Sequence, residues 1–207
     1  MNQVIGIDFD NTIICYDDVF HRLAVEAGLV AAEAPHRQKA IREAARNSPE
    51  GDLAWQRLQG QAYGPRILEA RPAEGVLAFL ASCCMAGVQV NVISHKTRFA
   101  SVDPTGTDLR QAAQEWMAKH GLFSEPIGLD PARFLCGATR QQKVELIRTT
   151  GCTHFIDDLM ETFLEEGFPA AVQAILYAPG EETVCSDRPG LWVARSWREI
   201  GARLQLG

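Results

Sequence analysis

Short apolar runs typical of buried strands alternate along the chain with longer stretches in which apolar residues keep helical spacing. The first run, Val4–Ile7, ends at Asp8 and predicts a buried strand that stops at an acidic cluster. Between residues 17 and 70 the pattern is helical instead, with apolar residues such as Phe20 and Leu23 three positions apart. The N-terminal third is therefore expected to hold one strand followed by a block of helices.

The helical block is interrupted where proline breaks the pattern, at Pro35, Pro49 and Pro65. Two interpretations are open for it: ordinary helices that cover a sheet, or a separate helical cap inserted after the first strand. The block is far longer than a single crossover connection, which favours the inserted cap. The expected domains are a core of residues 1–13 and 71–207 and a cap of residues 14–70.

After Pro72, strand and helix patterns alternate to the end of the chain. Strands separated by helices pair in parallel through right-handed crossovers, so the pattern predicts an α/β fold with a doubly wound parallel sheet. Helices are expected over residues 73–85, 108–120, 140–149, 161–166 and 197–204. Strands are expected over residues 88–93, 133–136, 153–156, 172–176 and 191–193.

Composition narrows the class of protein. In 207 residues, 46% are hydrophobic and 22% charged, as in soluble globular proteins, and no apolar run approaches the ~20 residues of a membrane span. The net charge of −6 argues against a broad nucleic-acid surface. The start of the sequence has no secretory pattern, and its cysteines lie in apolar segments without a Cys-x-x-Cys pair, so we expect a cytoplasmic protein with reduced thiols. These cysteines are Cys15, Cys83, Cys84, Cys136, Cys152 and Cys185.

Polar residues gather where three of the expected strands end. Asp8 and Asp10 follow the first strand, Ser94 follows a second, and Asp157-Asp158 follow a third. In doubly wound sheets ligands bind beyond these carboxyl ends, and carboxylates that converge there need a cation such as Mg²⁺. The alternative is that each aspartate only caps the helix that follows, but two doublets at strand ends favour a site.

The spacing within the first cluster indicates a mechanism. Asp8 and Asp10 lie two positions apart in an extended segment and so point the same way. Asp8 can serve as a nucleophile toward a phosphate ester, and Asp10 can act as general acid and base. Lys143 could offset the charge of the substrate, although a lone helical lysine is otherwise a surface residue.

The four motifs resemble those of the haloacid dehalogenase superfamily of phosphohydrolases, in the family's order and at its usual separations. The resemblance covers residues 3 to about 165 and implies a Rossmann-like α/β core with a small helical cap between the first two motifs. Two segments, 93–98 and 152–159, look like those of uncharacterised bacterial members, and this likeness does not indicate a substrate. The matching motifs are Ile5-Gly-Ile-Asp8-Phe-Asp10-Asn-Thr12, Val90-Asn-Val-Ile-Ser94, Lys143 and Phe155-Ile-Asp157-Asp158.

The resemblance also implies roles for the matched residues. Asp8 is expected to be the nucleophile and a metal ligand, and Asp10 the general acid/base with its backbone carbonyl on the metal. Ser94 is expected to bind the phosphoryl oxygens together with the backbone N–H groups of Asp10 and His95. The catalytic set is Asp8, Asp10, Ser94 and Lys143.

The second acidic doublet would complete the metal site. Asp158 is expected to bind Mg²⁺ directly, whereas Asp157 either holds a metal-bound water or orients Lys143. Thr12 would bond back to a first-strand carboxylate, and Glu161 is either a distal carboxylate of the site or a favourable charge at a helix N-terminus. The expected metal ligands are Asp8, Asp10, Asp157 and Asp158, with Mg²⁺ as the cofactor.

The sequence departs from the family pattern near the phosphate. Asn11 stands where many members have Gly, and His95 where Asn is common, while Lys96 and Arg98 add positive charge that belongs either to substrate binding or to a solvated loop. The residues expected to bind substrate or phosphate are Asn11, Thr12, His95, Lys96 and Arg98.

Together the motifs predict a Mg²⁺-dependent phosphomonoesterase that acts on a small phosphorylated metabolite through an aspartyl-phosphate. A phosphomutase of the same fold and a non-catalytic metal- or phosphate-binding module are the alternatives, and a nucleotidase stays possible although no base-stacking motif stands out. Asp10 argues against dehalogenases and phosphonate hydrolases, whose resembling members lack an acid there. Neither a nucleic-acid polymer nor a membrane is an expected partner, and the oligomeric state is not predicted.

Overall fold

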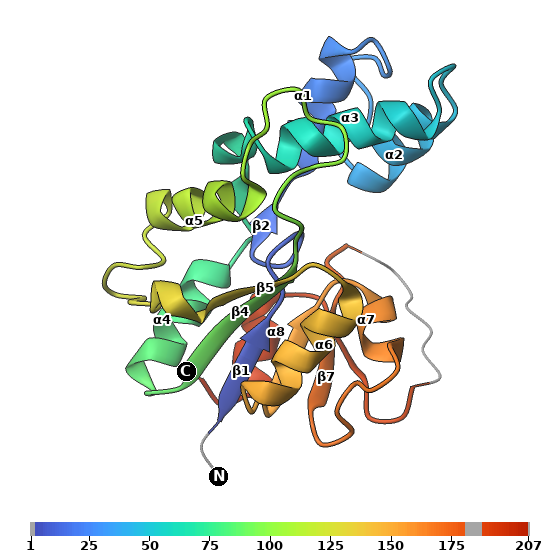
Figure 1. Cartoon of the computed structure of the whole chain (residues 1–207). Coiled ribbons are helices and arrows are strands. Elements are labelled where there is room, and N and C mark those ends of the chain that lie inside the picture. Colours follow the sequence, from blue (N-terminus) through green and yellow to red (C-terminus); the bar gives the residue numbers. More distant parts are fainter. Residues whose placement is uncertain (1–2, 181–187, 207) are drawn as a thin grey trace. The chain divides into compact units, whose positions relative to one another are not determined.

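Six parallel strands form the central sheet of the computed structural model, which describes residues 3–180 and 188–206 (Figure 1). Their spatial order is β5-β4-β1-β6-β7-β8, and every adjacent pair is parallel. The predicted doubly wound parallel sheet is therefore confirmed. The strands are β1 (Val4–Ile7), β4 (Gln89–His95), β5 (Phe134–Gly137), β6 (His154–Asp157), β7 (Gln173–Tyr177) and β8 (Trp192–Ala194).

Strand β1 lies at the centre of the sheet, between β4 and β6. Ile5 and Ile7 are fully buried, as expected for a strand covered on both faces. Gly6 leaves no room for a side chain, because a Cβ atom there would come within 2.5 Å of the Phe155 ring and 2.7 Å of the Cys152 sulfur. This close approach brings β1 and β6 into register, with Gly6 opposite Phe155, and so aligns the ends of the two strands.

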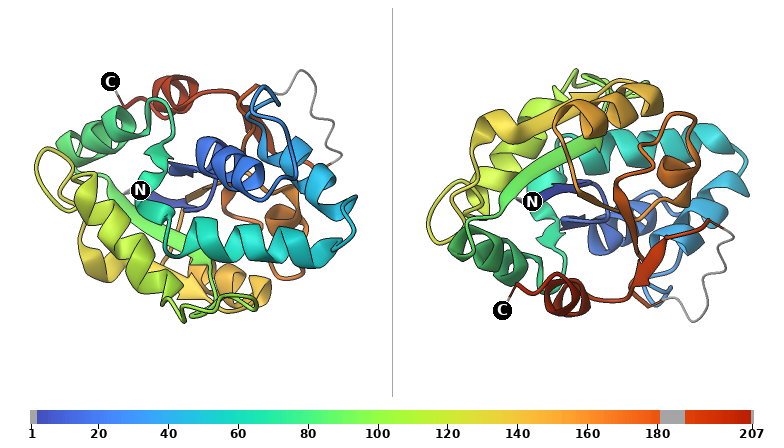
Figure 2. Two further views of the ribbon diagram at one scale, coloured as in Figure 1. Left: turned by 90° about the horizontal axis from the view of Figure 1, so that it is seen from above. Right: turned by 90° about the horizontal axis from the view of Figure 1, so that it is seen from below.

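Helices cover both faces of the sheet (Figures 1 and 2). Ile147 of α6 and Phe163 of α7 pack into one buried cluster with Ile93 of β4. On the other face, the rings of Phe79 in α4 and Trp197 in α8 lie 4.8 Å apart. The helices of the two faces are α4 (Val76–Met85), α6 (Arg140–Thr149), α7 (Met160–Leu164) and α8 (Trp197–Arg203), with a 3₁₀ turn η2 (Pro131–Arg133) before β5.

A second group of helices has its own core of aromatic side chains. The Phe20 ring stacks on Trp55 at 4.9 Å and meets Tyr63 edge-on at 5.7 Å, while Tyr16 packs against Tyr63 at 4.8 Å. Burial of such rings is the main source of stability in a small helical unit. Its elements are α1 (Asp17–Glu26), α2 (Gln38–Arg46), α3 (Asp52–Tyr63), the 3₁₀ turn η1 (Ile67–Glu69) and α5 (Leu109–Lys119).

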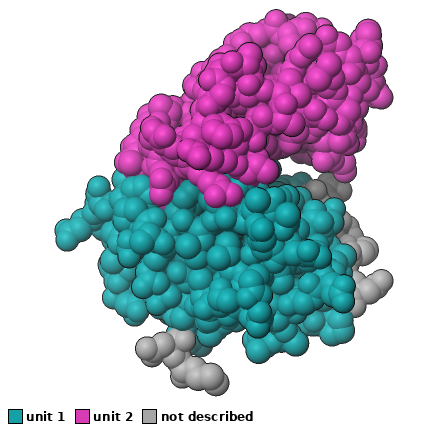
Figure 3. Space-filling model, in the orientation of Figure 1, with its two compact units in different colours: residues 1–13, 72–96, 120–207 teal, residues 14–71, 97–119 magenta. Residues whose placement is uncertain are grey.

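The chain divides into two compact units, coloured separately in Figure 3. The first comprises residues 1–13, 72–96 and 120–207, and the second comprises residues 14–71 and 97–119. The second unit contains the expected cap but also α5, which the sequence analysis placed in the core. Helix α5 joins this unit because the fully buried Trp116 donates a hydrogen bond from Nε1 to the carbonyl oxygen of Ala70 at 2.8 Å.

Smaller differences from the sequence analysis concern strand ends and cysteines. Short strands β2 (Ile14–Cys15) and β3 (Arg71–Pro72), which the pattern did not predict, pair as a two-stranded sheet. Among the described cysteines, all of them free, Cys83 and Cys152 are core thiols as expected, but Cys84 is exposed; Cys185 lies outside the described residues. Over the described ranges, no helix is long and apolar enough to pass through a membrane.

Candidate active site

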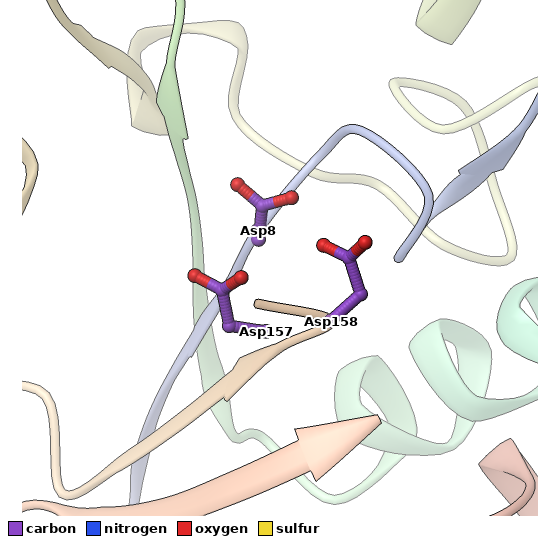
Figure 4. Close-up of side chains that lie close together, drawn as sticks. All are labelled: Asp8, Asp157 and Asp158. Carbon is purple, nitrogen blue, oxygen red and sulfur yellow. The ribbon is translucent and has the colours of Figure 1, made fainter. Parts of the chain in front are cut away.

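The ends of the three central strands bring the predicted site residues together. Asp8 directly follows β1, Ser94 is near the end of β4, and Asp157 is the last residue of β6. Because β4 and β6 flank β1 in a parallel sheet, these residues meet at one edge, where doubly wound folds bind their ligands. Figure 4 shows the carboxylates of Asp8, Asp157 and Asp158 side by side at this edge.

Lys143 joins the two acidic clusters. Its Nζ atom donates to Oδ1 of Asp8 and to Oδ2 of Asp157, each at 2.6 Å, and all three side chains are buried. Helix α6 presents this lysine from its first turn, which the Thr139 hydroxyl caps by accepting from a backbone N–H. A Cβ atom on Gly137 would come within 2.6 Å of the backbone nitrogen of Lys143, so the glycine lets the helix start close to β5.

Both oxygens of Asp157 have protein partners. Oδ2 accepts from Lys143 and Oδ1 accepts from the backbone N–H of Leu159 at 2.9 Å. Of the two roles that the resemblance implies for Asp157, this geometry matches the orientation of Lys143.

The donor set at the strand ends suits a hard divalent cation. Carboxylate oxygens of Asp8, Asp157 and Asp158 lie within 4.8 Å of one another. Oxygen ligands of this kind are the ones Mg²⁺ prefers, with water or substrate completing the shell. When all four carboxyl groups, Asp10 included, are ionised, their charge exceeds that of the ammonium groups of Lys96 and Lys143 by two, the amount that one divalent cation neutralises.

The acidity of these groups reflects the crowding of negative charge. Burial raises the pKa of Asp8 to about 7, reinforced by the charges of Asp157 and Asp10 and opposed by Lys143. Burial also raises the pKa of Asp158 well above its usual range, with the nearby Asp8 carboxylate adding to the effect. Burial alone lowers the pKa of Lys143, but the charges of Asp157 and Asp8 outweigh it and raise that pKa. The lysine therefore stays charged while the carboxylates lack a full counter-charge.

Asp10 is held by two side chains from β4 and the segment after it. The Ser94 hydroxyl donates to Oδ2 at 3.2 Å, and Lys96 Nζ donates to Oδ1 at 2.9 Å. Lys96 is 4% exposed, so it is not part of a solvated loop. Sequence reasoning missed its contact with Asp10, although residues 94 and 96 point the same way in an extended segment.

The remaining predicted residues have simpler surroundings. Asn11 adopts a φ of 57°, a left-handed conformation that Gly and Asn tolerate best, which accounts for Asn at a position where Gly is common in the family. The Thr12 hydroxyl lies 3.5 Å from Asp8 Oδ2, as the resemblance implied. His95 is exposed, with Nε2 3.3 Å from the Ala138 carbonyl oxygen.

Arg98 and Glu161 are the last two predicted site residues to place in the structure. Arg98 belongs to the second unit, where its Nε lies 2.8 Å from Oδ2 of Asp108. Its assignment to phosphate binding stays a prediction. Glu161 is exposed in the first turn of α7, a position where a negative charge favours the helix.

The chain is similar in fold to several solved structures, and the similarity extends over nearly its whole length. A haloacid dehalogenase-like family hydrolase from Xanthomonas campestris is 16% identical, with a TM-score of 0.55, covering 99% of this chain and 95% of that one. A HAD family hydrolase from Deinococcus radiodurans, with bound phosphate and sodium, is 16% identical with a TM-score of 0.56, over 100% and 96% of the chains. A protein from Bacillus subtilis assigned to the HAD-hydrolases and bound to magnesium is 11% identical with a TM-score of 0.58, over 98% of both.

The chain therefore has the fold of the haloacid dehalogenase-like hydrolases, and the resemblance seen in its motifs is confirmed at the level of the fold. No protein-family model and no curated protein matches the sequence.

Proposed function

We propose that the protein is a Mg²⁺-dependent phosphomonoesterase that acts on a small phosphorylated metabolite. The observation that carries this proposal is the contact of Lys143 with both Asp8 and Asp157, beside Asp158. A buried carboxylate nucleophile beside a fixed ammonium and a cation site can receive a phosphoryl group. The magnesium and phosphate bound to the similarly folded structures are compatible with that chemistry.

The first step transfers the phosphoryl group to Asp8. A carboxylate oxygen of Asp8 attacks phosphorus, and the bond between phosphorus and the ester oxygen breaks. Asp10, which enters this step in its protonated form, gives its proton to the leaving oxygen. The product is an aspartyl-phosphate and a free alcohol. Lys143 remains protonated throughout and offsets negative charge on the phosphoryl oxygens and on Asp8.

The second step releases phosphate. Asp10, now a carboxylate, takes a proton from water, the water oxygen attacks phosphorus, and the bond to the Asp8 oxygen breaks. We assign Ser94, whose hydroxyl donates to Asp10 in the structure, to binding the transferring oxygens when substrate is present. Asp8 and Asp158 would hold Mg²⁺, which would supply positive charge to offset that of the phosphoryl dianion.

A phosphatase screen over a panel of small phosphate esters tests this proposal. The intact protein is assayed with Mg²⁺ and with EDTA, beside Asp8→Asn as the inactive control and Glu145→Gln, an exposed change on α6, as the neutral one. Phosphate release that requires Mg²⁺ and Asp8 supports the proposal. Full activity in EDTA, or phosphate binding without turnover, contradicts it, and a slowly hydrolysed aspartyl-phosphate would point to a mutase.

A further inference from the structure

Lys96 is a buried lysine to which the steps above assign no part. The sequence contains four lysines, of which Lys39 and Lys119 are exposed and Lys143 lies in the acidic cluster. Lys96 is 4% exposed, nearly as buried as Lys143. A buried ammonium is costly unless charged or polar partners compensate it, so its position calls for a physical reason.

The contacts of Lys96 fix both ends of the residue. Its backbone N–H donates to the carbonyl oxygen of Gly137 at 2.9 Å, which anchors the segment after β4 to the end of β5. Its Nζ atom lies 2.9 Å from Asp10 Oδ1 and 5.6 Å from the centre of the Phe9 ring. The lysine therefore reaches Asp10 along a fixed path within the first unit.

Lys96 and Ser94 together hold both oxygens of the Asp10 carboxylate. Ser94 donates to Oδ2 at 3.2 Å while Lys96 donates to Oδ1. A carboxylate held at both oxygens has a defined orientation of its lone pairs, and any rotation away would leave the buried ammonium without this partner. Proton transfer to a substrate depends on such a defined direction.

We propose that Lys96 is a positioning residue that fixes the Asp10 carboxylate in the orientation from which it exchanges protons with the leaving oxygen and with water. This inference rests on the proposed function, because it assigns Lys96 a part in the same reaction. Lys96 acts through Asp10, whereas Lys143 acts on Asp8.

The inference predicts a loss that depends on the leaving group. An alkyl phosphate needs a proton on its leaving oxygen, whereas para-nitrophenyl phosphate leaves as a stable anion and needs little help. Removing Lys96 should therefore lower kcat for ethyl phosphate by about 10²-fold, the cost of a misplaced catalytic group. The loss for para-nitrophenyl phosphate in the phosphorylation step should be much smaller, and KM should change little.

The experiment compares Lys96→Met with Lys39→Met, which removes an exposed lysine from α2. Single-turnover phosphorylation and steady-state kinetics are measured on both substrates with Mg²⁺, in the wild-type and Asp10→Asn backgrounds. Because a positioning residue has nothing to position in Asp10→Asn, Lys96→Met should cost no further activity there. Lys39→Met should behave as wild type.

The outcomes separate this inference from the proposed function. An inactive wild type contradicts both. An active wild type contradicts the positioning role in three cases: equal losses on the two substrates in the single-turnover phosphorylation step, a raised KM, or additive losses with Asp10→Asn. Each of these results assigns Lys96 to phosphate binding or to folding. If Lys96→Met does not fold, Lys96→Arg provides the same comparison, since guanidinium keeps the charge but not the point contact. Lys96→Arg must then show the larger loss on ethyl phosphate than on para-nitrophenyl phosphate, and an equal change in activity on both substrates overturns the inference.

Discussion

The Nζ atom of Lys143 lies 2.6 Å from Oδ1 of Asp8, although 135 positions separate the two residues in the sequence. The contact joins the first turn of α6 to the end of β1, and both side chains are buried. Since Asp157 accepts from the same ammonium, one lysine is the shared ion-pair partner of two buried carboxylates. Folding and the proposed chemistry therefore depend on the same charge.

Replacing Lys143 with Met should destabilise the protein strongly. Asp8 and Asp157 would remain buried without their shared partner, and breaking a buried ion pair from one side typically costs about 3–5 kcal/mol. Urea unfolding in metal-free buffer at neutral pH measures the change. The exposed Lys39→Met should stay within about 0.5 kcal/mol of wild type. If the two variants lose equal amounts, the ion pair does not contribute as described.

Replacing Asp158 with Asn should stabilise the metal-free protein at high pH. The folded-state pKa of Asp158 is raised, so the folded protein holds a proton that the unfolded chain releases above its ordinary pKa of 3.8. Stability is therefore highest below that value and falls as pH rises through the folded-state pKa. The variant, which has no such proton, should match wild type near pH 4 and melt at a higher temperature near pH 8. Thermal unfolding with EDTA across this range is the measurement, and a variant less stable than wild type at pH 8 would contradict the raised pKa.

Magnesium should reverse the order of the two melting temperatures near pH 8, so that wild type becomes more stable than Asp158→Asn. A ligand that binds only the folded state stabilises it by about 2.7 kcal/mol at 100 times its Kd, so the wild-type melting temperature should rise with Mg²⁺. Asp158→Asn should lose most of this response, because one of the three clustered carboxylates is gone. Glu161→Gln, an exposed change three positions away, should keep it. An equal response in both variants would place the cation elsewhere.

The two aspartates of the first motif should differ in their effects on turnover. Asp8→Asn should abolish phosphate release, because the nucleophile is lost, while leaving phosphate binding measurable by calorimetry. Asp10→Asn should reduce kcat by about 10²–10⁴-fold, the usual contribution of a general acid or base. Mild and equal losses in both variants would mean that another group attacks phosphorus.

The strands of the sheet and most residues of the site could be predicted from the sequence, because each strand and each motif depends on a few neighbouring residues. Helix α6 was predicted at residues 140–149 and has those bounds, since Thr139 caps its start and Gly151 follows its end. The placement of α5 was not predictable, because an amphipathic helix shows that one face is buried but not what covers it. Nor was the path of Lys96, since sequence spacing gives the direction of a long side chain but not its partner.

The helices of the second unit should depend on one another for folding. Replacing residues 17–68 with a short Gly/Ser linker would remove α1, α2, α3 and most of η1 but keep α5. Trp116 and Met117 of α5, both buried in the intact protein, would then lose partners, and exposed apolar surface of this kind promotes aggregation. This variant is expected to bind a hydrophobic dye and to precipitate on concentration.

A second deletion that also replaces residues 98–118 is the matched control, because it removes α5 together with its partners. It should stay soluble, melt cooperatively, and keep the Asp8–Lys143 contact, since both residues belong to the first unit. Light scattering, dye binding and thermal unfolding compare the two proteins. If the first deletion is as soluble and cooperative as the second, α5 is stabilised by the first unit, and the boundary lies where the sequence pattern placed it, at residues 14–70.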